Sequence, residues 1–377
     1  MKKFKVYVSD YDYGNIDIEK SILEPIGAEV IGLQCKTGEG LAELAKDANA
    51  IIQQYAKIPR ETIQQLKDCK IISPNQDGSF YKEFARAVGT VSTAQFMKRV
   101  WTATVGLDLL AKAILRLRPF AKDKQQAQRM YDLAVRKWIA AIEKSASRAG
   151  LTQLMEETAE EFDKVTLDAK FQKPRIGIVG EIYVRSHLFA NGNIIARLEE
   201  LGAVCDLASL AEWIYYMNFC EASRMKRKRQ YVKLLANRLR DFVQHRIEQK
   251  LAAPLERRLG RLAESNVEHT ISLAGPYIDE SFEGEAILSI GKMVELHHEG
   301  FGGVVNVMPF TCMPSTIVSG QTMRISADCG NMPILNLSFD GQEDVTLKTR
   351  LEAFVEQVAA GSVACGKATQ VKAVRLA

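Results

Sequence analysis

The stretch Gly302-Gly303-Val304-Val305-Asn306-Val307-Met308-Pro309-Phe310-Thr311-Cys312-Met313-Pro314 gives the clearest indication of the fold. Its run 304–307 is short and mostly β-branched, which is typical of a buried central strand. Pro309 and Pro314 enclose a stiff turn, because each proline fixes its own φ and restricts the residue before it. Cys312 therefore follows the carboxyl end of a predicted strand, where open α/β sheets bind ligands. From spacing alone this thiol is either a metal or cluster ligand or, more commonly for a lone cysteine, a packing residue.

The same stretch belongs to a C-terminal α/β domain, which we predict to span residues 171–377. A buried strand at 176–180 leads into a polar loop that carries Glu181, Tyr183 and Arg185. Helices are expected at 193–201, from 283 onward and around 348–354, and further strands at 203–207 and 334–339. Asp340 and Arg350 lie near the end of the last strand, either as a cap and a surface ion pair or as part of a site.

Residues 1–74 alternate short apolar runs with helical patterns. The apolar runs are 4–8, 28–33, 50–53 and 70–72, and the helical patterns are 18–26, 40–48 and 60–66. Strands and helices that alternate at this pitch predict a small parallel α/β layer. The segment 10–13 follows the first strand, so we expect a ligand loop there.

Residues 75–170 form a predicted helical middle segment. Its apolar stripe recurs every three or four residues at Phe96, Val100, Ala103, Leu107, Leu110, Ile114 and Leu117. Arg118-Pro119-Phe120 ends this helix, since proline excludes the helical conformation from the residue before it. A second helix is expected to stop at Gly150, and a third to include 156–165. The fold class is therefore α/β, with parallel Rossmann-like sheets and a helical middle segment.

Two nucleotide-binding motifs are missing from the sequence. Gly177 and Gly180 do not complete a G-x-G-x-x-G loop, because its third glycine position is occupied by Tyr183. A G-x-x-x-x-G-K-[ST] loop does not occur either. We therefore expect no NAD and no direct ATP binding.

The segment 224–261 is the most basic part of the chain and predicts an amphipathic helix, broken at Pro254. This positive charge indicates one of two things. Either the helix has a solvated positive face, or it has a surface that binds phosphate or a partner protein through Arg227, Lys228 and Arg229. Interleaved aromatic residues are too few for stacking on single-stranded nucleic acid. Nucleic acid is therefore not an expected partner.

Composition limits the class of protein further. The 377 residues are 47% apolar and 25% charged, with a net charge of +4, as in an ordinary globular protein. The seven cysteines are scattered and odd in number, so we expect a reducing cytoplasm and no disulfide framework. They form no C-x-x-C pair, so we expect no self-contained zinc ribbon or ferredoxin-type cluster. We see no signal peptide and no apolar run near 18 residues, so we expect no membrane segment.

The N-terminal 72 residues resemble the front half of the substrate-binding domain of D-2-hydroxyacid dehydrogenases. The matching motifs are Ser9-Asp10-Tyr11-Asp12, Gln34-Cys35-Lys36-Thr37, Asp47-Ala48-Asn49-Ala50 and Leu66-Lys67-Asp68-Cys69-Lys70-Ile71-Ile72. The family continues into a glycine-rich cofactor domain, whereas this chain runs into Ser73-Pro74-Asn75-Gln76-Asp77-Gly78. The segment therefore looks like a grafted or truncated module.

A second resemblance covers about three quarters of the chain, from residue 80 to residue 360. Its motifs are Gly180-Glu181-Ile182-Tyr183-Val184-Arg185, Glu283-Gly284-Glu285, Met308-Pro309-Phe310-Thr311-Cys312-Met313-Pro314 and Thr349-Arg350-Leu351-Glu352-Ala353-Phe354. It begins near Tyr81–Phe84 and Arg86 and includes Trp101, Asp108 and the segment 116–119. Together these resemble the 2-hydroxyacyl-CoA dehydratase superfamily, in particular the dehydratase-like portion of CoA activase-related proteins and of double-cubane iron–sulfur proteins.

This resemblance implies an iron–sulfur cluster on cysteine thiolates, reduced by a separate ATP-dependent activator. It makes Cys312 a cluster ligand and Glu181 and Arg185 catalytic residues. Cys205, Cys220 and Cys329 match no motif of the family, and the remaining ligands are expected from these cysteines, with Cys220 and Cys329 as the candidates, or from another chain. A CoA ester would bind near the basic helix, and the partner is the activator or a second dehydratase-type subunit. The family's other ligand cysteines lie in a preceding domain. In this chain the dehydrogenase-like N-terminal segment stands in place of that domain. The expected function is an iron–sulfur component of such a reductase system in the cytoplasm of an anaerobe; the alternatives are a scaffold or regulatory partner that has lost the cluster and a 2-hydroxyacid dehydrogenase relative.

Overall fold

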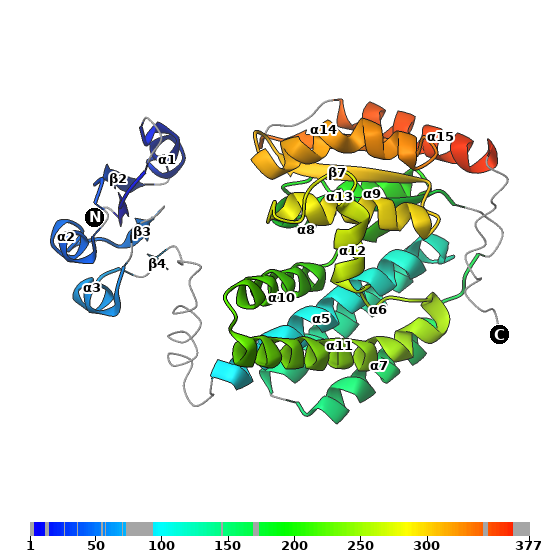
Figure 1. Ribbon diagram of the computed structural model, residues 1–377, viewed down its shortest axis with the longest axis horizontal. Coiled ribbons are helices and arrows are strands. Elements are labelled where there is room, and N and C mark those ends of the chain that lie inside the picture. The colour runs from blue at the N-terminus through cyan, green and yellow to red at the C-terminus, as the bar shows by residue number, and fades with distance from the viewer. Residues whose placement is uncertain are drawn as a thin grey trace. The chain divides into compact units, whose positions relative to one another are not determined.

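The structure is a computed structural model of residues 1–377 (Figure 1). It describes residues 4–11, 15–25, 27–35, 37–53, 56, 58–69, 71–72, 93–144, 146–168, 173–341 and 346–364. The chain forms two compact units, Met1–Met97 and Lys98–Ala377. Both domain boundaries expected from the sequence, after residue 74 and after residue 170, lie outside the described residues, as do Tyr81–Phe84 and Arg86 of the resemblance.

The first unit contains a sheet of four parallel strands in the order β2-β1-β3-β4. These are β1 (Phe4–Val8), β2 (Ala28–Gly32), β3 (Ala50–Ile52) and β4 (Ile71–Ile72), joined by α1 (Asp17–Leu23), α2 (Gly38–Leu44) and α3 (Arg60–Gln65). Tyr7 and Ile51 pack with α2, while Val6 and Val8 pack with Val30 in a separate cluster. Alternate residues of each strand thus fill separate cores, as a parallel sheet covered on two faces requires.

The second unit begins with the helices of the middle segment. These are α5 (Thr93–Leu117), the 3₁₀ turn η1 (Arg118–Phe120), α6 (Lys124–Glu143) and α7 (Arg148–Asp163). The end predicted for α5 before Pro119 is confirmed. The stop predicted at Gly150 is wrong, because the Ser147 hydroxyl accepts a hydrogen bond from the Gly150 amide at 3.1 Å and so caps the start of α7.

A sheet of four parallel strands, in the order β6-β5-β7-β8, forms the centre of this unit. The strands are β5 (Arg175–Gly180), β6 (Val204–Leu207), β7 (Gly303–Pro309) and β8 (Ile334–Phe339). Between and after them run α8 (Ile182–Ser186), α9 (Ile194–Glu200), α13 (Glu285–His298), α14 (Met313–Asp328) and α15 (Leu347–Ala364). The predicted α/β class with parallel Rossmann-like sheets is confirmed.

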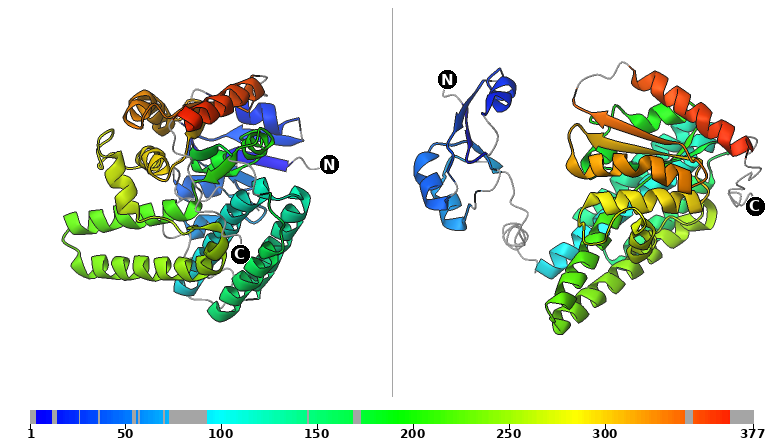
Figure 2. Two further views of the ribbon diagram at one scale, coloured as in Figure 1. Left: turned by 90° about the vertical axis from the view of Figure 1, so that its right-hand side faces the viewer. Right: turned by 45° about the horizontal axis from the view of Figure 1, so that its top comes forward.

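Helices cover both faces of this sheet. Ile176 and Ile178 face a core that also contains side chains of α9 and α15. Val179 belongs to the core on the other side, where α13 and α14 pack. A Cβ at Gly177 would lie 2.3 Å from Leu296 of α13, so this glycine lets the helix approach the strand. The right-hand view of Figure 2 shows α15 on one side of the sheet and α13 and α14 on the other.

Outside α13 the unit continues into a helical layer. Its further members are α10 (Leu210–Arg227), α11 (Tyr231–Leu259) and α12 (Val267–Ala274), which share one core with α5, α6 and α7. The helix break predicted at Pro254 is wrong, and α11 continues to Leu259. Leu251, Leu255 and Leu259 are all buried in the shared core. Burial of this stripe outweighs the one hydrogen bond that proline removes from the helix.

Charged side chains lie inside this helical core. The Lys292 ammonium is 3.1 Å from Glu264 Oε2 and 3.2 Å from Glu295 Oε2. Lys112 of α5 also pairs with Glu264. These groups are buried, and a buried charge is tolerated only where it is paired and hydrogen-bonded. No helix in the described part of the chain combines the length and the apolar character that a membrane crossing needs.

Candidate functional site

The carboxyl edge of the β6-β5-β7-β8 sheet is the natural place for a ligand. From β5 the chain crosses to β6 on one side, and it later enters β7 on the other side. Strand order therefore reverses between β5 and β7, and such reversals open a crevice at the carboxyl ends of the strands. The loops after β5 and β7 carry Glu181 and Cys312, so the structure brings these two predicted site residues to one edge.

Gly180 ends β5 in a conformation that suits glycine. Its φ is +119°, and a Cβ there would lie 2.0 Å from the Val307 carbonyl oxygen. The next residue, Glu181, donates its amide to the same oxygen at 3.0 Å. The Glu181 carboxylate accepts hydrogen bonds from the amides of Tyr183 (3.1 Å) and Val184 (2.8 Å). Glu181 thus caps α8 at the edge of the sheet.

Arg185 lies under this turn rather than on the surface. Its side chain is 3% exposed and donates to the carbonyl oxygens of Gly180 (3.2 Å) and Ser209 (2.8 Å). Its Nε has no hydrogen-bond partner among the described residues. In this position the guanidinium fixes the loop that carries Glu181. A direct catalytic role for Arg185 stays a prediction.

Glu285, the first residue of α13, is an electrostatic neighbour of Glu181 that the sequence reasoning did not select. Burial raises the pKa of Glu285, the charge of Glu181 raises it further, and Arg185 opposes both. A carboxyl group with a raised pKa beside a second carboxylate is suited to holding and releasing a proton. The feature of the sequence that points to Glu285 is its position directly after Gly284, at the start of the helix predicted from residue 283 onward.

Cys312 lies at the end of the turn that follows β7. Thr311 before it has a φ of +63°, a left-handed conformation that is unusual for a β-branched residue. The Cys312 thiol is half-buried and accepts a hydrogen bond from the Ser315 hydroxyl at 3.4 Å. The residue stands at the N-cap of α14, with Pro314 in the first turn. Strained backbone of this kind is concentrated at functional sites.

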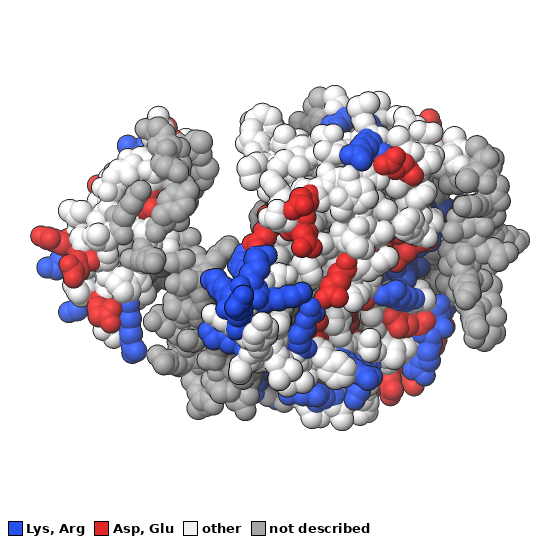
Figure 3. Space-filling model, viewed as in Figure 1, with Lys and Arg blue, Asp and Glu red and all other residues white. Residues whose placement is uncertain are grey.

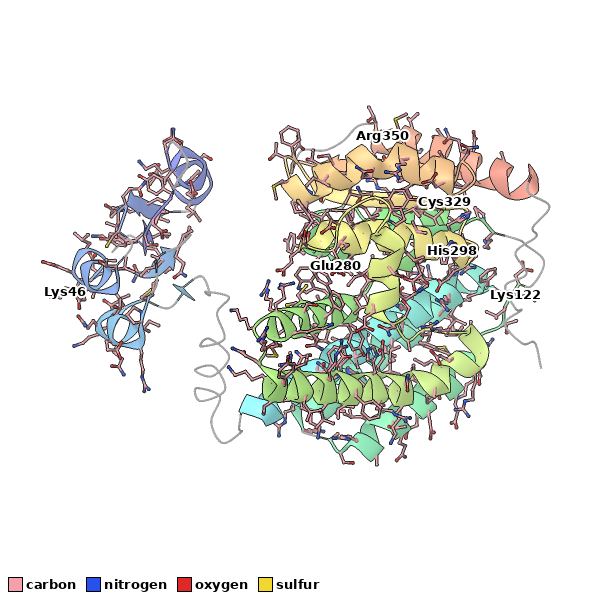
Figure 4. All side chains as sticks on the ribbon, viewed as in Figure 1. Lys46, Lys122, Glu280, His298, Cys329 and Arg350 are labelled. Atoms are coloured by element: carbon pink, nitrogen blue, oxygen red, sulfur yellow. The ribbon has the colours of Figure 1, made fainter. Side chains whose placement is uncertain are left out.

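The other two predicted cysteine ligands lie elsewhere. Cys329 follows the opposite end of α14, a 16-residue helix, and is therefore about 24 Å from Cys312 along the helix axis. Cys220 is buried in α10, where burial raises the pKa of its thiol. Figure 4 shows Cys329 where α14 ends. The structure does not bring Cys312, Cys220 and Cys329 together.

A cluster would need more thiolates than this edge offers. Iron–sulfur clusters are held by several cysteines, commonly four. Among the described cysteines of the second unit, Cys312 alone follows a strand at the carboxyl edge, and Cys205 is buried within β6. The described residues contain no group of three or more His, Cys, Asp or Glu side chains placed to hold a metal ion. These residues therefore do not fit a complete cluster by themselves.

Arg227, Lys228 and Arg229 are exposed at the end of α10, as expected for a basic surface. Arg227 Nη2 is 3.6 Å from Glu283 Oε1, and Arg224 pairs with the same carboxylate. Because Glu283 lies two residues before Glu285, this pairing ties the basic residues to the start of α13. Figure 3 shows Lys and Arg side chains gathered over this region beside a group of acids.

Arg350, left open between a surface ion pair and a site role, donates from Nη2 to the Asn336 carbonyl oxygen of β8 at 2.7 Å. It therefore braces α15 against the sheet.

In the first unit, Asp10 is 1% exposed, and its Oδ1 accepts hydrogen bonds from Ser9 Oγ (2.7 Å) and the Ala56 amide (3.1 Å). This carboxylate ties Ala56 to the segment that follows β1; the rest of the expected ligand loop, residues 12–13, lies outside the described residues.

A cavity of about 190 Å³ lies between α10, α11 and α12, and the sequence reasoning missed it. The His245 ring stacks on Tyr215 with centroids 3.8 Å apart, and the Tyr215 hydroxyl donates to Glu248 Oε2 at 2.6 Å. Burial lowers the pKa of His245, and Asp241 opposes this. Burial also raises the pKa of Glu248 to about 7. His245 and Glu248 come from the inner face of α11 and Tyr215 from α10, positions that an apolar-stripe search does not examine.

No protein-family model matches the chain, and no curated protein sequence matches it. The resemblance to the 2-hydroxyacyl-CoA dehydratase superfamily therefore stays a prediction from the quoted motifs. What the structure adds is the fold and the position of each motif on it.

Proposed function

We propose that this protein is a component of a 2-hydroxyacyl-CoA dehydratase-type reductase system and supplies Cys312 to an iron–sulfur cluster that a second subunit completes. The observation that carries the proposal is the position of Cys312. It lies at the reversal point of a parallel sheet, behind a strained Thr311 and on the same edge as Glu181. Thiolate is the preferred protein ligand of iron–sulfur clusters.

The need for a partner follows from the cysteine positions. Cys220 is buried within α10 and Cys329 follows the far end of α14, so thiolates from another chain would have to complete the ligand set. The ATP-dependent activator or a second dehydratase-type subunit is the expected source of electrons or ligands. When bound, the cluster would supply low-potential electrons.

The chain's own residues have separate tasks in this proposal. Glu285, whose pKa is raised by burial and by the charge of Glu181, is the residue that we assign to proton transfer. Arg185 keeps the loop of Glu181 in place from below. Arg227, Lys228 and Arg229 offer exposed positive charge for the phosphates of a CoA ester.

Anaerobic copurification with a candidate partner subunit tests the proposal. The complex is expected to contain iron and acid-labile sulfide and to be brown. Cys312→Ser should remove most of the iron, because serine keeps the side-chain size but not the thiolate ligand. Cys329→Ser is the matched control and should retain the iron, since this side chain lies beyond the far end of α14. Thermal unfolding of each variant checks that the fold is intact.

The dispersal of the cysteines favours a second candidate function. A scaffold or regulatory partner that has lost the cluster would keep the fold and the sheet edge without the ligand set. A complex that stays colourless and free of iron after anaerobic reconstitution would contradict the cluster proposal and support this alternative. Equal iron loss in Cys312→Ser and Cys329→Ser would also contradict the assigned ligand.

A further inference from the structure

The first half of α11 carries its polar side chains inward. Asn237 donates to Glu221 Oε2 of α10 at 2.9 Å, and Asp241 accepts a hydrogen bond from Asn218 of α10 at 3.0 Å. Polar contacts therefore join this half of α11 to α10. An ordinary surface helix does the reverse and packs its apolar stripe against the core.

The apolar stripe of this half faces outward instead. It consists of Val232 (85% exposed), Leu235 (72%), Leu239 (62%) and Phe242 (56%), which we call the α11 stripe. Tyr231 and Val243 extend it on either side, at 66% and 37% exposed. Single exposed apolar residues are common on proteins, but a contiguous set marks an interaction site.

The spacing of the α11 stripe suits another helix. Its residues are separated by three, four and three positions, which is the a/d pattern of two successive heptads. On a helix these four side chains form one seam about 15 Å long. A seam of this kind accepts the apolar side chains of one partner helix between its own.

The charges around the α11 stripe indicate which kind of partner helix would bind there. Residues 224–246 contain nine Lys and Arg residues and a single acid, Asp241. Four of the nine pair within the chain: Arg224 and Arg227 with Glu283, Arg238 with Glu268, and Arg240 with Glu221. The other five, Lys226, Lys228, Arg229, Lys233 and Arg246, have no ion pair with a described residue. The seam therefore lies in a part of the chain with net positive charge.

We propose that the α11 stripe docks an amphipathic helix of a partner protein whose apolar seam is flanked by Asp and Glu. A second copy of this chain would bring two positive surfaces together, which like-charge repulsion disfavours. The heptad spacing of the α11 stripe matches the side chains of a facing helix, whereas a membrane surface requires no such register. This inference does not depend on what the sheet edge binds.

The test uses the full chain and a labelled synthetic peptide about three heptads long, with Leu at its a and d positions and Glu at e and g. Fluorescence anisotropy should show saturable binding that weakens as salt is raised, since flanking charges are screened. The double variant Leu235→Gln/Leu239→Gln should bind roughly tenfold more weakly or worse. Both side chains are exposed, so the fold is expected to persist, and thermal unfolding verifies this.

Two controls and two rival outcomes complete the test. Met323→Gln removes an equally exposed apolar side chain from α14 and should leave the affinity unchanged. A peptide of the same composition with its Leu residues out of register should not bind. Absent binding, or equal binding by the double variant, would overturn the proposal. Stripe-dependent dimers in sedimentation would assign the surface to a second copy, and stripe-dependent binding to phosphatidylserine vesicles without peptide binding would assign it to a membrane.

Discussion

Glu248 is a buried carboxyl group with a hydrogen-bond donor on each oxygen. The Tyr215 hydroxyl reaches Oε2 at 2.6 Å, and the Glu264 amide reaches Oε1 at 3.0 Å. Burial raises the pKa of Glu248 from 4.5 to about 7, and the nearby charge of Glu264 also raises it. Folded protein therefore holds a proton on Glu248 across a pH range in which the unfolded chain has released it.

The variant Glu248→Gln should gain stability relative to the wild type as pH rises. Because the folded-state pKa is the higher one, the wild type loses stability between about pH 4.5 and pH 7, and a neutral amide does not. The free energy of unfolding of the variant minus that of the wild type should increase by about 2–3 kcal/mol from pH 5 to pH 8. Urea unfolding at the two pH values measures this. A difference that does not change with pH would show that Glu248 titrates normally.

At the scale of single residues, the sequence located side chains that follow strands better than those within helices. Cys312 and Glu181 share an edge because parallel strands end together, and the order of apolar runs already predicts that. Cys220 and Cys329 share with Cys312 only their residue type, and the length of α14 separates Cys329 from Cys312. Glu285 was missed because its proximity to Glu181 depends on where α13 starts relative to β5.

Among the secondary-structure elements, the turn from β5 to α8 depends on a single glycine. An alanine at Gly180 would need a φ near +119° and would place its Cβ 2.0 Å from the Val307 oxygen. Gly180→Ala should therefore lower the free energy of unfolding by about 3 kcal/mol or more. A Cβ at Gly320, within α14, would meet open space, so Gly320→Ala should raise stability by about 0.5–1 kcal/mol. Urea unfolding of both variants checks the contrast, and similar effects would contradict it.

The elements that the sequence predicted well are those in which local preference and burial agree. The β-branched runs of β5 and β7 are buried, and both are strands as expected. Predictions failed where one residue was given too much weight. Pro254 lies in a helix held by three buried leucines, and Gly150 lies in the first turn of α7, where the Ser147 cap determines the start. Tertiary packing and capping outweigh the local preference of a single proline or glycine.

On the scale of the whole molecule, the two compact units have separate hydrophobic cores. Leu41 and Ile51 lie in a core of the first unit, and Leu109 lies in the large core of the second. Each cluster of buried residues in the described structure contains residues of one unit only. Residues that share one hydrophobic core unfold together, so each unit is expected to unfold in a cooperative transition of its own.

Calorimetry of the full chain should therefore resolve two transitions that respond to different substitutions. Leu41 and Leu109 are 0% and 1% exposed, and replacing a buried leucine with alanine costs about 2–5 kcal/mol. Leu41→Ala should lower only the transition of the first unit, and Leu109→Ala only that of the second. A chain that begins at residue 93 should retain the second transition at its original temperature. If both substitutions shift one common transition instead, the two cores are energetically coupled and the units unfold together.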